Sequence, residues 1–241
     1  LAVYSFMDSA IIGRSGSFTV KNYVYLFHSE DLRSMIFGTL ILAVVVAVIS
    51  TILGTLGAIG AFYSSKKLKR PIHLMNQIPV VNADVVTGFS ICVLLIVFFK
   101  MDKASYIPLV IGLVSLCSPF VYLSVIPRLK QMDPLLYEAA LDLGCSSFGA
   151  LRKVVLPQLT SGIVSGFMMS ITLTLDDYFI TTYTKPSMFD TISTYVVNAT
   201  KGAQTDVKTA LWALSTIIFL IVIFVVIGMN HTGRKENDHE I

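Results

Sequence analysis

The sequence predicts an all-α membrane protein, and three observations lead to this fold class. Of the 241 residues, 54% are hydrophobic and only 14% are charged, whereas a soluble domain usually carries about 25% charged residues. The mean hydropathy is +0.75. Several apolar runs reach the roughly 20 residues that a helix needs to cross a bilayer, and clusters of lysine and arginine follow some of these runs.

Six transmembrane helices are expected from these runs. The chain opens on an apolar stretch, so we expect residues 1–8 to be the end of a first helix, truncated in this sequence, and residues 9–34 to be an extracytoplasmic segment. Four of the other five spans are expected at about residues 35–63, 75–99, 106–126 and 209–229, and the fifth span runs from about residue 159 to the LDDYF stretch at 175–179.

The first of these five spans carries small residues at three- and four-residue spacing, which let helices approach closely within lipid. We therefore expect one nearly bare, tightly packed face made of Gly54, Gly57, Ala58, Gly60 and Ala61.

The basic residues predict the orientation. Their clusters lie at residues 66–70, 128–130, 152–153 and 234–235, all on one side of the predicted membrane. The positive-inside rule makes this side cytoplasmic, although single lysines and arginines on the other side are nearly as numerous. Both termini are therefore expected in the cytoplasm. Basic residues beside membrane spans account for the net charge of +3, so we expect a lipid bilayer and no nucleic acid as a partner.

Motifs for metal binding and catalysis are missing from the sequence. The three cysteines form no CxxC pair and the four histidines no HExxH motif, so neither a disulfide framework nor a metal centre is predicted. The sequence has no GxSxG motif and no GxxxxGK[ST] phosphate loop, the motif that cradles nucleotide phosphates. We expect no catalytic residues and no ATP hydrolysis by this chain.

A polar stretch at residues 128–157 interrupts two of the most apolar runs. Asp133 suits a helix N-cap, Pro134 the first helical position, and Gly144 the left-handed position after the helix. A second short helix is expected to start near Ser146 or Ser147, and Pro157 to bend the chain before the fifth span.

The first of these short helices has two faces. Its apolar face is expected to hold Leu135, Leu136, Ala139, Ala140 and Leu143, with Glu138 and Asp142 opposite. An amphipathic helix that rests on lipid usually has a basic polar face, whereas this helix carries only acids. The pattern favours docking into a groove of a soluble protein over resting on lipid.

The same stretch contains Glu138-Ala139-Ala140, three residues, Gly144, nine residues and Val154-x-Leu156-Pro157. This spacing resembles the EAA loop of permease subunits in binding-protein-dependent ABC importers, with Val154 in place of the family's isoleucine.

The resemblance implies a type I ABC importer permease fold over residues 35–230, with a coupling loop at 128–157 and a cytoplasmic tail at 231–241. It also implies a bacterial cytoplasmic membrane, an ATPase partner that binds ATP and Mg²⁺, a second permease subunit and an extracytoplasmic binding protein. The residues it assigns to ATPase coupling are Glu138, Ala139, Ala140, Asp142, Gly144 and Pro157.

Ionisable residues inside the spans are candidates for the transport pathway, because each costs about 2.5–3.5 kcal/mol at a helix centre. Asp84, with Asn82 nearby, falls in the third span, and Asp176 and Asp177 end the fifth. The acids either leave the membrane into water or line a pathway that attracts cations.

The sequences SITLTLDDYFITTYT and VVNADVVTGFSI resemble the second permease subunit of spermidine/putrescine importers. That branch commonly has Pro-Asp where this chain has Ala83-Asp84, so any kink must come from Pro79. The resemblance implies a polyamine cargo, with another small solute (an organic acid, a phosphonate or a metal chelate) as the alternative. The candidate pathway residues are Asn82, Asp84, Asp176, Asp177 and Tyr178. The outer segment 185–205 is expected to hold a short helix ended by Gly202 and to meet the binding protein.

Overall fold

The computed structural model describes residues 4–6, 18–19, 24, 28–65, 71–72, 74, 76, 84–102, 104–133, 135–201, 216, 219–220 and 223. The first and sixth expected spans lie almost wholly outside these residues, as do the cluster 66–70, Pro79, Asn82, Gly202 and the tail 231–241. Every regular element in the described part of the chain is helical.

The elements follow one another along the chain as separate helices and short helical turns. They are η1 (Tyr4–Phe6), α2 (Glu30–Tyr63), α4 (Asp84–Cys92), η2 (Val93–Phe98), α5 (Ile107–Gln131), α6 (Leu135–Asp142), α7 (Ser147–Ala150), η3 (Leu151–Val155), α8 (Leu156–Gln158), α9 (Thr160–Asp176), α10 (Phe179–Thr184) and α11 (Ile192–Lys201). The segments η2 and η3 are π-helical.

Three of the expected spans are found in the described residues. Helices α2 and α5 are long and apolar enough to cross a membrane. Helix α9 covers the expected fifth span, and a 70° bend joins it to the helical segment 147–158 that precedes it. Helix α5 covers the fourth expected span and continues beyond it through Pro127 to Gln131.

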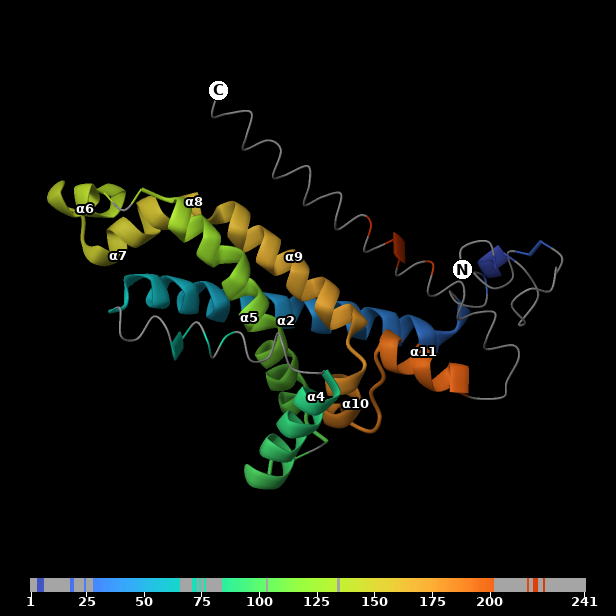
Figure 1. Ribbon diagram of the computed structural model, residues 1–241. Coiled ribbons are helices and arrows are strands. Elements are labelled where there is room, and N and C mark those ends of the chain that lie inside the picture. The colour runs from blue at the N-terminus through green and yellow to red at the C-terminus, as the bar shows by residue number, and fades with distance from the viewer. Residues whose placement is uncertain are drawn as a thin grey trace.

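Helices α2, α5 and α9 pack together in the centre of the molecule (Figure 1). Val121 of α5 lies between two glycines, since a Cβ on Gly54 would be 2.6 Å from the Val121 Cβ and one on Gly166 would be 3.1 Å from its Cα. Ala58 and Ala61 are buried on the same face of α2 as Gly54. The expected small-residue packing is thus confirmed for these residues.

The expectation is wrong for Gly57 and Gly60. A Cβ on Gly57 would have its nearest neighbour at 4.0 Å, and one on Gly60 would have none within 4 Å. At about 100° per residue, Gly60 lies about 120° around the helix from Gly54, whereas Gly57 lies at the exposed edge of the face that Gly54 shares with the alanines.

Helix α4 leaves the central bundle sideways together with α10 (Figure 1). Ile180 of α10 is fully buried between Gly88 of α4 and Gly112 of α5. The ring of Phe89 meets that of Tyr183 edge to face, with centroids 5.9 Å apart. The short helix that follows the fifth span is therefore fixed against the third and fourth spans.

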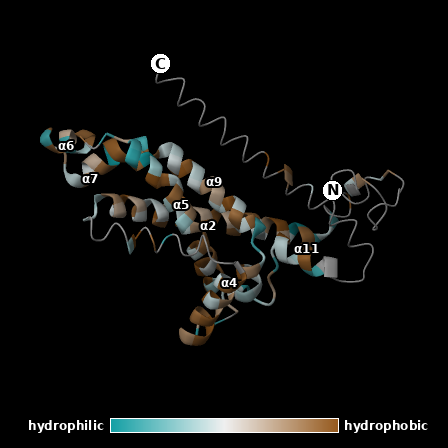
Figure 2. Cartoon of the chain, in the orientation of Figure 1, coloured by the Kyte–Doolittle hydropathy of each residue, from teal (hydrophilic) through white to brown (hydrophobic). Residues whose placement is uncertain are grey.

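The two ends of the bundle differ. Helices α6, α7 and α8 lie at one end and α11 at the other (Figure 1). Figure 2 shows hydrophilic residues gathered where α5, α6 and α8 meet, whereas hydrophobic residues cover the far end of α4 and η2. The polar loop is thus separated from the outer helix by the whole length of the bundle.

Candidate functional site

Helix α6 starts as the sequence predicts. The Asp133 carboxylate accepts a hydrogen bond from the backbone N–H of Leu135 at 2.9 Å, and the Asp133 carbonyl accepts one from Leu136. These bonds satisfy donors that a helix start otherwise leaves unpaired.

The end of α6 is a Schellman motif. The N–H of Cys145 donates to the carbonyl of Ala140 at 3.0 Å, and the N–H of Gly144 donates to the carbonyl of Leu141 at 2.9 Å. Gly144 has φ +84°, in the left-handed region that glycine adopts without steric cost. The expected glycine stop is confirmed, and it defines where the helix ends and where the next turn begins.

The loop packs against the bundle through side chains that no sequence motif indicates. The ring of Tyr137 packs on that of Tyr63, at the end of α2, with centroids 4.9 Å apart. Ala150, Val155 and Leu159 are fully buried. The pair Tyr63–Tyr137 could not be found from spacing, because it joins residues 74 positions apart in the sequence.

The outward surface of the loop is both acidic and apolar. Glu138, Ala139 and Asp142 are exposed, and the side chains of Leu143 and Phe148 are 86% and 76% exposed. Of the expected apolar face of α6, only Ala140 is buried. The leucines on the rest of that face are exposed, so the fold of this chain does not bury them.

A second short helix follows at the expected place. Ser146 caps α7, its Oγ accepting a hydrogen bond from the N–H of Gly149 at 3.2 Å. The π-helical segment η3 then leads to Pro157 in α8. The expected bend is confirmed, because the chain turns by 70° between α8 and α9. Helix α9 is thereby joined to the polar loop 128–157 through a short, sharply bent connection.

The acid pair at the other end of α9 is divided by the fold. Asp177 is 9% exposed, and its carboxylate accepts hydrogen bonds from the backbone N–H and from the Oγ1 of Thr181, both at 2.8 Å. It therefore holds the first turn of α10. Asp176 is exposed at the last position of α9, and its carbonyl accepts a hydrogen bond from Ser193 of α11.

Of the other pathway candidates, Asp84 and Tyr178 lie near the junction of α9 and α10. Asp84 opens α4, one turn before Gly88, which packs on Ile180 of α10. The first turns of α4 therefore lie beside the short helix that Asp177 caps. Tyr178 is half-buried, with its ring edge to face on Phe179. Asn82 lies outside the described residues.

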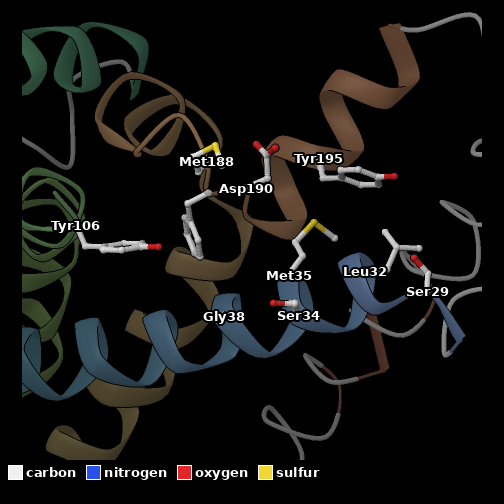
Figure 3. A pocket seen from close by; sticks show the side chains of 10 residues that line it. Ser29, Leu32, Ser34, Met35, Gly38, Tyr106, Met188, Asp190 and Tyr195 are labelled. Atoms are coloured by element: carbon white, nitrogen blue, oxygen red, sulfur yellow. The ribbon is translucent and has the colours of Figure 1, made fainter. Parts of the chain in front are cut away.

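A cavity of about 650 Å³ opens near the start of α2 (Figure 3). Met35 of α2, Tyr106, and the segment that leads into α11 line it. One wall is held by an ion pair of 2.7 Å between Lys185 and Asp190, and by the N–H of Ile192, which donates to Thr39 Oγ1 at 3.2 Å. No sequence motif predicts this cavity, because its lining comes from three segments that are far apart in the sequence.

The expected outer helix is present as α11, which is described from Ile192 to Lys201. Gly202 itself lies outside the described residues.

Comparisons with known proteins agree with this arrangement. Residues 51–232 match the family model described as binding-protein-dependent transport system inner membrane component. The spermidine/putrescine transport system permease protein PotC of Escherichia coli K12 is 28% identical over 98% of this chain and 88% of its own length. The putrescine transport system permease protein PotI of the same strain is 27% identical over 90% of this chain and 78% of its own length.

Solved structures share the fold. A bacterial ABC transporter involved in import of the acidic polysaccharide alginate superposes with a TM-score of 0.70 at 18% identity, over 91% of this chain and 84% of that one. The MetNI methionine ABC transporter, in inward-facing conformations, gives a TM-score of 0.65 at 14% identity, over 86% and 98%.

Proposed function

Because the chain belongs to the family of binding-protein-dependent transport system inner membrane components, we propose that it is a permease subunit of an ATP-driven importer of polyamines. It is a multi-pass protein of the bacterial inner membrane. With a second permease subunit it forms the path through the bilayer, and both termini lie in the cytoplasm. An extracytoplasmic binding protein delivers the cargo, and a separate ATPase subunit binds ATP and Mg²⁺.

The observation that carries the coupling role is the exposed, firmly ended helix α6. Its acids and leucines face outward while Ala140 and Tyr137 tie it to the bundle. A helix that presents apolar side chains beside acids suits a groove in a partner protein. We assign coupling to Glu138, Ala139, Ala140, Asp142 and Gly144, with Pro157 at the bend. A push on α6 would reach α9 through α7, η3 and α8.

The polyamine cargo is supported by relatives named as spermidine/putrescine and putrescine permeases. It agrees with acids at the outer end of the fifth span and at the start of α4. Carboxylates stabilise ammonium groups, whereas they repel organic acids and phosphonates. We assign Asp84, Asn82, Asp176 and Tyr178 to the pathway, and Asp177 to the fold around it.

Competition uptake tests this function. Cells that lack the gene, and the same cells with the gene restored, are given labelled spermidine or putrescine with an excess of an unlabelled competitor. We expect restored uptake that the other polyamine inhibits and that organic acids, phosphonates and metal chelates leave unchanged. Uptake that is not restored, or that an acidic solute abolishes, would reject the polyamine assignment.

A further inference from the structure

Helix α9 has three distinct faces. Its buried face consists of small residues, Gly162, Gly166, Ser170 and Thr174, which pack at four-residue spacing toward α5 and α2. A second face carries large apolar side chains, among them Val164, Phe167 and Ile171. The third face, which we term the polar stripe, contains Ser161, Ser165, Met169, Thr172 and Asp176.

The polar stripe is accessible along its whole length. Met169 is 39% exposed, Asp176 is exposed, and the three hydroxyl residues are partly exposed. At about 100° per residue these five positions fall within roughly 80° of one another. A carboxylate and three hydroxyls in one line are unfavourable toward lipid, whereas the apolar face beside them suits lipid or another helix. The segregation indicates that the stripe faces water.

Hydrogen bonding leaves the stripe rich in acceptors. The Thr172 hydroxyl donates its proton to the carbonyl of Met168 at 3.1 Å, so its oxygen lone pairs remain to accept a bond from elsewhere. The Asp176 carboxylate only accepts. Asp177 contributes differently, because its carboxylate already binds two donors of Thr181.

We propose that the polar stripe of α9 is the surface along which a polyamine passes, with Asp176 at its outer end and Asp177 serving only to hold α10. This inference rests on the proposed function and assigns the path of the cargo to the residues of the polar stripe. A polyamine alternates ammonium groups, which are donors only, with short methylene segments. In the stripe, oxygen acceptors lie on both sides of the Met169 thioether, and successive turns of the helix repeat at about 5.4 Å. The ammonium groups meet the oxygens and the methylenes meet the methionine.

The position of the stripe also links it to the ATPase. Its first residue, Ser161, comes two residues after Leu159, where the chain bends by 70° toward the docking loop. From there to Asp176 the stripe extends about 22 Å at 1.5 Å rise per residue. Any tilt of α9 driven from α6 therefore moves every acceptor of the stripe together.

Thiol accessibility in the complete reconstituted transporter tests this proposal. In a background freed of Cys92, Cys117 and Cys145, single cysteines are placed on the stripe (Ser165→Cys, Thr172→Cys) and on the apolar face (Phe167→Cys, Ile171→Cys). A membrane-impermeant quaternary-ammonium methanethiosulfonate is then added. We expect at least tenfold faster labelling on the stripe, and slower labelling there when spermidine is present during ATP turnover.

Uptake kinetics supply the second readout. Thr172→Val, which removes only the hydroxyl at nearly constant shape, and Asp176→Asn should raise the KM for spermidine at least fivefold. Asp177→Asn keeps an oxygen that can accept the Thr181 hydrogen bonds. Its KM for spermidine should stay within twofold of that of the unaltered transporter.

The outcomes distinguish failure of the proposed function from failure of the polar stripe as the cargo path. A wild-type transporter that takes up no spermidine rejects the proposed function itself. A transporter that works while both faces label equally, or while spermidine gives no protection, overturns the stripe. If Asp177→Asn raises the KM for spermidine as much as Asp176→Asn does, the proposed difference in role between the two acids is wrong.

Discussion

Replacing Gly144 by valine should uncouple the transporter without unfolding it. Gly144 has φ +84°, and a Cβ built there meets no atom within 4 Å. The cost is therefore a matter of backbone conformation and not of crowding. The left-handed conformation costs about 1–2 kcal/mol for an ordinary L-residue, and a β-branched residue is a genuine outlier there.

The strain acts on two hydrogen bonds. To relieve it, the chain must give up the bonds from Gly144 to Leu141 and from Cys145 to Ala140. Helix α6 has only eight residues, so loss of its last turn moves Asp142 and Leu143 away from the docking surface. Since about 1.4 kcal/mol is a factor of ten in population, we expect the coupled rate to fall by about tenfold.

The assay is ATP hydrolysis by the reconstituted complex, stimulated by cargo-loaded binding protein, measured together with uptake. Gly144→Asn is the matched control, because asparagine tolerates the left-handed region, and it should keep more than half of the activity. Thermal melting in detergent verifies that both variants are folded. Normal stimulation in a folded Gly144→Val protein would refute the role of the helix stop.

Three further changes test the packing. Gly54→Ala places a Cβ 2.6 Å from Val121 and 2.8 Å from the carbonyl of Ser118, so overpacking should lower the melting temperature in detergent by an amount worth about 1–3 kcal/mol. Gly60→Ala, in open space, should leave it unchanged or raise it, and equal effects would contradict the packing. Asp177→Ala removes a helix cap and should destabilise by about 1 kcal/mol, with Asp177→Asn near wild type in the same melt. Tyr137→Ala removes the contact with Tyr63 and should reduce cargo-stimulated ATP hydrolysis several-fold, whereas Tyr137→Phe keeps the ring and should not.

The features that the sequence predicted correctly are local ones. Asp133 and Gly144 mark the ends of a short helix because capping depends on the nearest few residues. Ser146 and Pro157 likewise act on their immediate neighbours, and the structure places the cap and the bend where they were expected.

The features that could not be predicted depend on distant contacts. The fourth span is expected to end near residue 126, yet α5 continues to Gln131, and Leu129 in this extension is fully buried against neighbouring elements. Asp176 and Asp177 are adjacent in sequence and looked equivalent. They differ because the helix breaks between them and Thr181 then folds back onto only one of the two carboxylates.

Coupled transport of a polycation is the most direct test of the proposed function. Vesicles that contain this subunit with its ATPase, second permease and binding protein can be followed for labelled spermidine and released phosphate at the same time. We predict that spermidine accumulates only with ATP, that phosphate release rises with it, and that both fall together in Gly144→Val. Accumulation without ATP, or ATP hydrolysis driven by an acidic solute and not by spermidine, would contradict the account.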